Sequence, residues 1–463
     1  MKRFLSWQLP AVLIVSVASV VGQTRVAAPA PLAGFWIGQL QGTPLHLELH
    51  LTRQGTTWHG VFTSVDQGGA RFPATAISVK GTQVVIQAAE AGATFTATLA
   101  EGRLSGTWKQ GGNSLALVLR RAHAAAAPAA PPRPQRPKPP FPYRSTGVTV
   151  SSMGGIKLAG TLTVPDGKGP FPAAILIGGS GPSNRNETVF GHNIFWVLAD
   201  ALSRHGLAVL RMDKRGIGQS GGDARTATLN DYAEDVDADL AFLRLQPKID
   251  AQRIGLIGHS EGGAIAPMVA SRHAGEVAFV ILLAGPAMPG TQMIVDQVEA
   301  LDAAHGLAVA EVAKAGAMEG VWARTIAAAP DAAAVPAALH EAVAQGKLPK
   351  GILREAGMAA TPEYYGLMRL NPGRYLRQLR CPVLALDGSK DVQVPAAANI
   401  AALRAALAHD PHATIVELPG LNHLFQPAQT GLPNEYASIP ITFAPSALHR
   451  IERWLAGVVG SKP

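Results

Sequence analysis

The sequence predicts an α/β fold with a mostly parallel sheet and a helical cap, preceded by a small all-β barrel or sandwich domain. From residue 143 to residue 463, short apolar runs alternate with helical patterns, which is typical of a parallel sheet covered by helices. Residues 32–121 instead alternate polar and apolar side chains between frequent turn signals, as antiparallel strands do. Residues 122–142 are rich in proline and alanine, and they predict a semi-rigid linker between the two parts.

Residues 1–22 have the pattern of a secretory signal peptide. Lys2 and Arg3 precede the apolar run 11–18, and cleavage is expected near Gln23, after small or short side chains. The apolar run is shorter than the roughly 20 residues that a membrane-spanning helix needs. An uncleaved N-terminal anchor is the alternative. We therefore expect an exported protein, periplasmic or secreted.

The all-β part is expected to hold seven or eight antiparallel strands. Leu45–Leu51 alternates with a period of two, and similar runs recur as far as Leu115–Leu119, separated by turn signals. Trp36, Trp58 and Trp108 could line a ligand cavity, but packing in the domain core is the simpler interpretation.

The α/β part opens with an antiparallel hairpin, residues 148–150 and 158–164. The parallel strands are then expected at residues 173–177, 207–210, 254–257, 279–283, 383–386 and 414–418. Tyr232, Val236, Leu240 and Leu243 share one face of a helix that packs on the sheet.

Residues about 287–375 interrupt this alternation with an Ala-rich, helical pattern. An insertion at this point lies over the carboxyl ends of the strands, where ligands bind in open α/β sheets. We interpret it as a helical cap. Its candidates for lining a pocket, or for packing the cap core, are Met288, Met293, Tyr364, Tyr365 and Met368.

Two segments match Gly-x-Ser-x-Gly, the pattern of a nucleophile elbow, in which a strand turns sharply into a helix and exposes a serine. Ser260 follows the apolar run 253–258 and precedes small apolar residues, so its context fits. Pro267 predicts a kink or a late helix start there. Ser220 has no strand directly before it and no helix directly after it. We therefore expect Ser260 to be the nucleophile and Ser220 to belong to a surface turn.

A serine hydroxyl needs a base, and the base needs a group that orients it. After this type of elbow the acid and then the histidine follow along the chain. Asp391 and His423 each follow a predicted strand in that order, so Asp391 would orient His423 and His423 would deprotonate Ser260. Asp387 is the rival acid, although Asp387-Gly388 suggests a turn.

The oxyanion formed in such a reaction needs two backbone donors. The Glu261 N–H, directly after the nucleophile, is expected to be one of them. The other should come from the glycine-rich loop at residues 178–182, with Ser180 the first choice and Gly179 the second. This loop lacks the Gly-Lys-Ser/Thr ending of a phosphate-binding loop.

Composition excludes several other classes of protein. The only cysteine, Cys381, allows no internal disulfide and no cysteine-based metal site, and it is expected to be a buried structural thiol. The net charge of +8 is modest, and no segment alternates basic and aromatic residues as a nucleic-acid groove would. We expect no metal, no organic cofactor and no nucleic-acid partner. The charge could favour weak association with an anionic membrane surface or cell wall.

Residues 143–463 resemble the α/β-hydrolase fold, and within it the exported bacterial carboxylesterases of the EstD type, which are related to prolyl-oligopeptidase-like peptidases. The motifs that carry this resemblance are Gly179–Pro182, Arg211–Ser220, Gly258–Gly263, Asp391–Pro395 and Leu421–Phe425. It implies the same nucleophile, acid and base. Asn184 and Asn186 stand where that family often has acidic residues. The segments around Trp36 and Trp108 resemble the lipocalin-like modules that precede some secreted bacterial hydrolases.

The sequence thus predicts a serine carboxylesterase that acts on short-to-medium acyl esters through an acyl-enzyme. A serine aminopeptidase or dipeptidyl peptidase is the first alternative. It would need a pair of cap glutamates for the substrate amino terminus, and Glu299, Glu311 and Glu319 are not paired in sequence. The second alternative is a lipid- or glycan-binding protein in which hydrolysis is secondary. The sequence does not indicate the oligomeric state.

Overall fold

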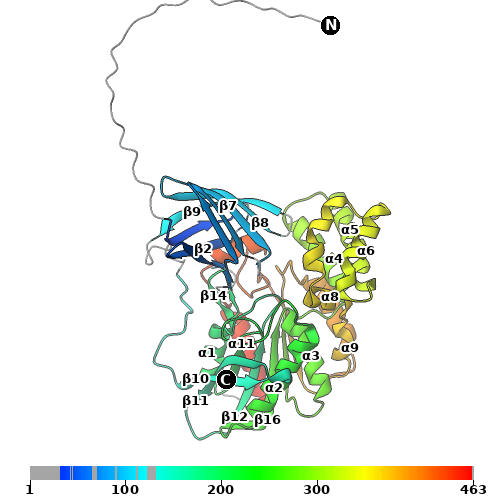
Figure 1. Cartoon of the computed structure of the whole chain (residues 1–463). Helices are drawn as coiled ribbons and strands as arrows, with labels where there is room; N and C mark the ends of the chain where they lie inside the picture. The colour runs from blue at the N-terminus through cyan, green and yellow to red at the C-terminus, as the bar shows by residue number, and fades with distance from the viewer. Residues whose placement is uncertain are drawn as a thin grey trace, which may run out of the picture.

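The computed structural model describes residues 32–41, 43, 45–64, 70–88, 91–110, 113–122 and 132–460; the predicted signal peptide lies outside them, as does part of the predicted linker. These residues form an antiparallel N-terminal sheet and a second, mixed sheet with helices on both faces (Figure 1). The predicted fold class, an all-β domain followed by an α/β domain, is confirmed.

The N-terminal domain is one curved antiparallel sheet in the order β4-β3-β2-β1-β9-β8-β7-β6-β5. Its strands are β1 (Gly34–Gln39), β2 (His46–Gln54), β3 (Thr57–Ser64), β4 (Ala70–Pro73), β5 (Ala76–Lys80), β6 (Gln83–Ala88), β7 (Ala93–Ala100), β8 (Arg103–Gln110) and β9 (Asn113–Ala122). The predicted count of seven or eight strands is wrong, because the described part of this sheet holds nine. The chain passes through Ala74 and Thr75 from one edge strand, β4, to the other, β5.

Large side chains from distant strands fill the inside of this curve. Trp36, Phe62, Phe95 and Trp108 are buried in one cluster, and Trp58 packs against its margin. The rings of Phe62 and Trp108 meet edge to face, with centroids 4.9 Å apart. Trp36 and Trp108 therefore serve core packing, as the simpler interpretation predicted.

The second sheet has the order β10-β11-β15-β12-β16-β17-β18-β19. Its strands are β10 (Tyr143–Ser151), β11 (Lys157–Pro165), β12 (Phe171–Ile177), β15 (Ala208–Met212), β16 (Ile249–His259), β17 (Val280–Leu283), β18 (Val383–Gly388) and β19 (Thr414–Leu418). Only β11 runs antiparallel to the others. This order, with its second strand reversed, is that of the α/β-hydrolase fold. Each predicted strand run overlaps one of these strands, although Leu207 and Phe279 lie directly before β15 and β17.

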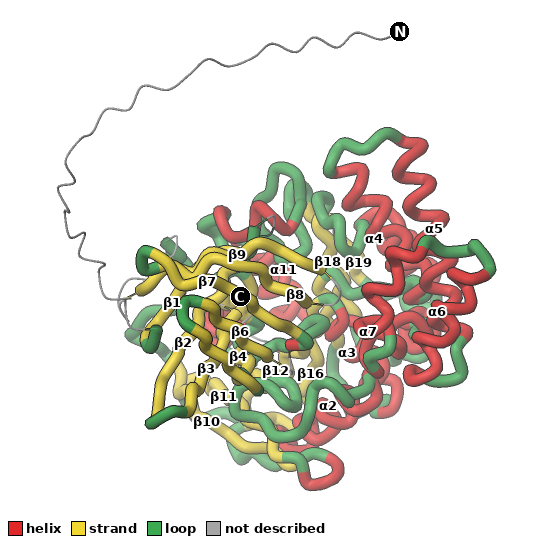
Figure 2. The backbone as a smooth tube through the Cα atoms, turned by 45° about the horizontal axis from the view of Figure 1, so that its top comes forward, coloured by secondary structure: helices red, strands yellow, loops and turns green. Residues whose placement is uncertain are grey.

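Helices cover both faces of this sheet (Figure 2). The helices α1 (Ile194–Arg204) and α11 (Pro445–Val459) pack on one face, where Phe195 and Ile451 share a buried cluster. The helices α2 (Leu229–Arg244), α3 (Glu261–Arg272) and α10 (Ala396–Ala406) pack on the other. The predicted face of Tyr232, Val236, Leu240 and Leu243 is buried on α2.

The chain between β17 and β18 forms a helical cap with a core of its own, in which Trp322, Ile326 and Leu339 are buried. Its α-helices are α4 (Gly290–Ala304), α5 (Val309–Ala328), α6 (Val335–Ala344), α7 (Ala356–Ala359), α8 (Pro362–Arg369) and α9 (Pro372–Leu376). The cap and the β domain stand side by side over the same end of the second sheet (Figure 1). Loops that leave this sheet at its carboxyl edge are therefore covered from two sides.

Candidate active site

Ser260 stands on a strained turn between β16 and α3. Its backbone has φ 53° and ψ −120°, a conformation that residues other than glycine rarely adopt. The turn is tight because Cβ atoms are absent around it. A Cβ at Gly258 would lie 2.1 Å from the Gly262 carbonyl oxygen, and one at Gly262 would lie 2.0 Å from the Ile177 carbonyl oxygen. The helix α3 begins directly at Glu261 and continues through Pro267, so the predicted late start is wrong.

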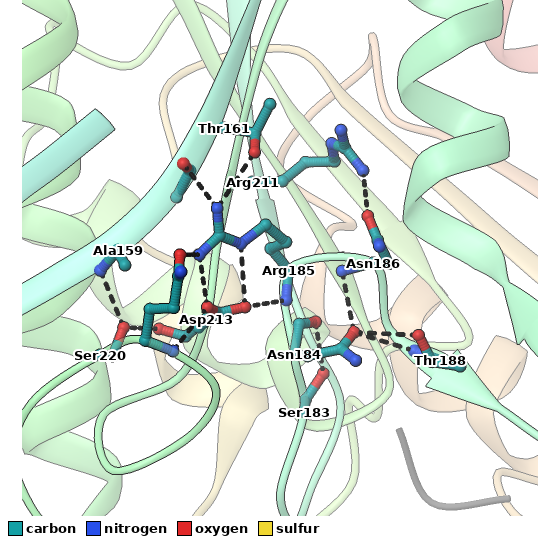
Figure 3. A network of polar contacts seen from close by, with 12 residues as sticks. Ala159, Thr161, Ser183, Asn184, Arg185, Asn186, Thr188, Arg211, Asp213 and Ser220 are labelled. Atoms are coloured by element: carbon teal, nitrogen blue, oxygen red, sulfur yellow. Dashed lines mark hydrogen bonds and ion pairs between the residues drawn. The ribbon is translucent and has the colours of Figure 1, made fainter. Parts of the chain in front are cut away.

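Ser220, the second serine in a Gly-x-Ser-x-Gly pattern, uses its hydroxyl for backbone contacts (Figure 3). Its Oγ donates to the Asp213 carbonyl at 2.8 Å and accepts from the Ala159 N–H at 2.9 Å. Ala159 lies in β11. The hydroxyl therefore holds a turn against the sheet, which is the structural role the sequence suggested.

Asp391 and His423 meet at the carboxyl edge of the sheet. His423 Nδ1 lies 2.7 Å from Asp391 Oδ2, and both side chains are buried. Asp391 Oδ1 accepts the Gln393 and Val394 N–H groups at 2.8 and 2.9 Å. Since the carboxylate can only accept, Nδ1 carries a proton, and Nε2 is left as the basic nitrogen.

Ser260 and His423 line one cavity, although no hydrogen bond joins Ser260 Oγ to the imidazole in the described part of the chain. Such contacts are often long before a substrate binds. The three residues predicted as nucleophile, acid and base are thus brought to one place.

Asp387, the rival acid, is not in a turn as its sequence suggested. It lies near the end of β18, where it is buried and accepts a hydrogen bond from Asn399 Nδ2 at 2.9 Å. Burial raises the pKa of Asp387 to about 7. Asp387 therefore contacts Asn399, whereas Asp391 contacts the imidazole.

Of the three predicted oxyanion donors, Gly179 already has an acceptor within the protein. The Gly179 N–H donates to Glu187 Oε1 at 2.7 Å, so Gly179 is not available as a donor, and this second choice is wrong. Ser180 and Glu261 both line the cavity beside Ser260. Their N–H groups have no acceptor within the part of the chain that the structure describes. The first choices, Ser180 and Glu261, remain the candidates.

Sequence reasoning missed a buried pair next to these groups. Glu187 Oε1 also lies 2.9 Å from His259 Nδ1, and His259 Nε2 lies 2.9 Å from the His423 carbonyl oxygen. Burial disfavours a charged His259, but the Glu187 carboxylate outweighs this and raises the pKa of His259. Because both ring nitrogens face acceptors, His259 is held as a cation that donates twice. The sequence predicted only that His259 would point away from the nucleophile.

The loop that carries Glu187 is fixed by a polar network (Figure 3). The Arg185 backbone N–H and guanidinium donate to Asp213, with contacts of 2.6 to 3.1 Å. Asn184 Oδ1 accepts the backbone N–H groups of Asn186 and Thr188, and Asn186 Oδ1 accepts from Arg211. The two asparagines that depart from the family pattern therefore hold the loop in shape.

Two cavities flank Ser260. The cap-side cavity has a volume of about 370 Å³ and is mostly apolar. It is lined by Ser180, Gly181, Ser260, Glu261, Pro286, Met293, Ile294, Gln297, Met358, Thr361, Glu363, Tyr364, Leu367, Met368, Gln393 and Val394. Of the cap residues named from the sequence, Met293, Tyr364 and Met368 line it, whereas Met288 and Tyr365 do not.

The β-side cavity has a volume of about 320 Å³ and lies on the His423 side of Ser260. It is lined by Leu45, Gly179, Ser180, Pro182, Ser183, Glu187, Thr188, Val189, Phe190, His259, Ser260, Gln393, His423, Leu424, Pro433 and Tyr436. Leu45 belongs to the N-terminal domain, so side chains of both domains border this cavity.

Lys214 joins the cap to the elbow. Its ammonium lies 2.7 Å from Glu261 Oε1 and 3.4 Å from Glu363 Oε1, and Glu363 also accepts the Gly181 N–H at 3.0 Å. Burial opposes the charge on Lys214, but the two carboxylates outweigh this and raise its pKa. Burial raises the pKa of Glu261 to about 7. Glu363 is a cap glutamate that sequence reasoning did not single out.

Within the described ranges, no group of three or more His, Cys, Asp or Glu side chains could hold a metal ion. No described helix is both long and apolar enough to span a bilayer. Cys381 is half-buried, and burial raises the pKa of its thiol to about 11.

Parts of this chain are similar in sequence to known proteins. The profile of the family described as serine aminopeptidase, S33, matches residues 193–329, which include the elbow. Over 238 residues the chain is 30% identical to Esterase EstD of Thermotoga maritima, a match that covers 51% of this chain and 50% of EstD. The strand order and the matched segment are those of an α/β-hydrolase fold.

Two other similar proteins are PA2218, which is called uncharacterized, and Pf2001, which is named as an esterase. The chain is 30% identical over 122 residues to PA2218 of Pseudomonas aeruginosa, which covers 26% of this chain and 31% of PA2218. The solved structure of PA2218 aligns with 70% of this chain over 96% of the PA2218 chain, with 16% identity and a TM-score of 0.46. The solved structure of the Pyrococcus furiosus esterase Pf2001 aligns with 72% of this chain over 100% of the esterase chain, with 14% identity and a TM-score of 0.43. The chain thus spans half or less of the length of these two curated relatives.

Proposed function

We propose that this α/β-hydrolase is a serine carboxylesterase that cleaves short-to-medium acyl esters through an acyl-enzyme. The observation that carries the proposal is the buried Asp391–His423 pair beside Ser260, which stands on its strained turn between two cavities. The relative EstD is itself named an esterase. The cap-side cavity, at about 370 Å³, falls at the lower end of the range for small-ligand sites.

In the proposed reaction, Ser260 Oγ attacks the ester carbonyl carbon while His423 Nε2 accepts its proton. Asp391 keeps the imidazole oriented and stabilises the imidazolium. The N–H groups of Glu261 and Ser180 donate to the oxyanion, and each such donor contributes about 10²–10³ in rate. His423 then protonates the leaving alcohol. A water molecule, deprotonated by the same imidazole, releases the acid and restores Ser260.

A serine aminopeptidase is the second candidate, because the matching family bears that description and because Glu261 and Glu363 lie near the nucleophile. A substrate ammonium would have to bind between these carboxylates. Lys214 already lies within 4 Å of both, so it competes for that position. This internal cation favours the esterase.

The test is hydrolysis of p-nitrophenyl esters of increasing acyl length, beside aminoacyl and dipeptidyl p-nitroanilides. We expect ester turnover with an optimum at short or medium chains. Faster turnover of the anilides would instead support the peptidase. Lys214→Met provides a further comparison: if it increases anilide turnover, the two glutamates are able to hold an amino terminus.

Export to the periplasm or the medium is proposed from residues 1–22 alone. Fractionation of expressing cells, compared with a variant in which Lys2 and Arg3 are replaced by glutamate, tests it. Full-length protein of unchanged mass in the cytosolic fraction would contradict export.

A further inference from the structure

Both cavities beside Ser260 are open to an ester, and the position of His423 distinguishes them. His423 lines the β-side cavity and is absent from the lining of the cap-side cavity. In acyl transfer by a serine nucleophile, the histidine protonates the leaving group, which therefore departs on the imidazole side. If the proposed function holds, the alcohol part of the ester occupies the β-side cavity, and the acyl part lies under the cap.

The β-side cavity is bordered by the N-terminal domain through Leu45. This half-buried side chain stands directly before β2 and is hydrogen-bonded to residues near the end of β1. The Leu40 N–H donates to the Leu45 carbonyl at 2.9 Å, and the Leu45 N–H donates to Thr43 Oγ1 at 3.2 Å. These two bonds hold the Leu45 backbone in place at the edge of the cavity.

The chain after the β domain is anchored on the rim of the same cavity. The Arg133 guanidinium donates to the carbonyls of Phe190, Ala437 and Ile439 at 2.6 to 2.9 Å. Phe190 itself lines the cavity. Only nine residues separate Ala122, the end of β9, from Pro132. Such a stretch reaches at most about 35 Å, so the anchor keeps the β domain near this rim.

We propose that the β domain forms the roof of the alcohol subsite, and that the preferred substrates are esters of bulky, largely apolar alcohols such as aryl or branched alkyl alcohols. The lining supports this class, because Leu45, Val189, Phe190, Leu424 and Pro433 are apolar. Polar side chains, among them Ser183, Glu187, Thr188, Gln393 and Tyr436, line the rest of the wall. The Tyr436 hydroxyl already accepts a hydrogen bond from Gln393 Nε2 at 2.9 Å. At about 320 Å³ the cavity exceeds what methanol or ethanol would fill.

The experiment uses the full-length protein and one acyl group, with methyl, phenyl and 1-naphthyl acetates as substrates. Leu45→Trp reduces the space beneath the roof, and Leu45→Met keeps a side chain of similar size there. Phe35→Ala changes an exposed side chain of the same domain. We expect Leu45→Trp to lower kcat/KM for naphthyl acetate, relative to methyl acetate, by about tenfold. Leu45→Met and Phe35→Ala should keep the wild-type ratio within about twofold.

The outcomes separate this proposal from the proposed function. If the wild type hydrolyses the acetates and Leu45→Trp leaves the naphthyl-to-methyl ratio unchanged, the roof is wrong and the esterase stands. A fall of equal size for all three acetates would overturn the roof in the same way, because it leaves the naphthyl-to-methyl ratio unchanged. If the wild type hydrolyses no ester, the proposed function itself fails, and the alcohol subsite fails with it.

Discussion

His259 Nε2 lies 2.9 Å from the backbone carbonyl oxygen of His423, so the residue before the nucleophile holds the loop of the candidate base. Through Nδ1 the same ring reaches Glu187, which in turn binds the Gly179 N–H. One buried ion pair therefore connects the elbow, the oxyanion loop and the histidine loop, which come from three distant parts of the sequence.

Removing the carboxylate of this pair should impair catalysis without changing substrate choice. Glu187→Gln leaves the His259 cation without its anionic partner, and small displacements of the oxyanion loop follow. We expect kcat to fall about 10²-fold, with little change in KM or in acyl preference, measured by steady-state ester kinetics. Asp223→Asn, at an exposed pair with Arg225, is the matched control and should stay near wild type. A rise in KM alone would contradict the positioning role.

The same pair predicts how stability depends on pH. The folded pKa of His259 is raised above the usual value of about 6.5. The stabilisation by its protonation is therefore fully present below pH about 6.5 and is lost as pH rises through the raised pKa. Thermal unfolding of the wild type and of His259→Gln should differ most at low pH and converge at high pH. A difference that stays constant across this range would contradict a charged His259.

The two elbow-like serines should differ sharply on substitution. Ser260→Ala is expected to lose about 10⁴–10⁶ of the ester hydrolysis rate. Ser220→Ala removes only the hydrogen bonds to Ala159 and Asp213. The free energy of unfolding should therefore fall by about 1 kcal/mol, while the activity is retained. Ester hydrolysis assays of the two variants measure the activity, and denaturant titrations measure the free energy of unfolding. Full activity in Ser260→Ala would exclude it as the nucleophile.

The cap-side cavity should determine acyl length. Met293→Trp places a larger side chain in the wall of this cavity, so longer acyl chains no longer fit while acetyl esters still do. The optimum in a p-nitrophenyl ester series should move to shorter acyl groups, with kcat/KM for the longest chains falling about tenfold. Met318→Trp changes an exposed cap methionine and serves as the control. An unchanged optimum in Met293→Trp would place the acyl group elsewhere.

Much of the fold could be predicted from local patterns. The runs around Ile175, Val209 and Leu384 are apolar because each strand is buried on both faces, and this leaves a clear signal. Asp391 and His423 were found by their positions after such strands and by their order along the chain. The structure adds their hydrogen bond, which depends on how neighbouring strands bring two loops together.

The remaining features have no local signal. Glu187 and Glu363 act through partners far away in sequence, His259 and Lys214, so nothing in their own segments marks them. Asp387 looked like a turn residue beside a glycine, yet burial of the β18 end overrides that propensity. Only two residues connect the edge strands β4 and β5, so the sequence shows no turn signal between them. The number of strands was therefore predicted too low.

The backbone angle of Ser260 has a consequence for the evolution and engineering of this chain. Glycine adopts φ 53° without the steric conflict that a Cβ creates, whereas such strain costs about 1–3 kcal/mol for other residues. A Ser260→Gly chain should therefore fold more stably than the natural one while lacking its nucleophile. Selection for thermal stability alone would then favour loss of the Ser260 hydroxyl. Any directed evolution of a more stable variant therefore has to screen for catalytic turnover in the same step.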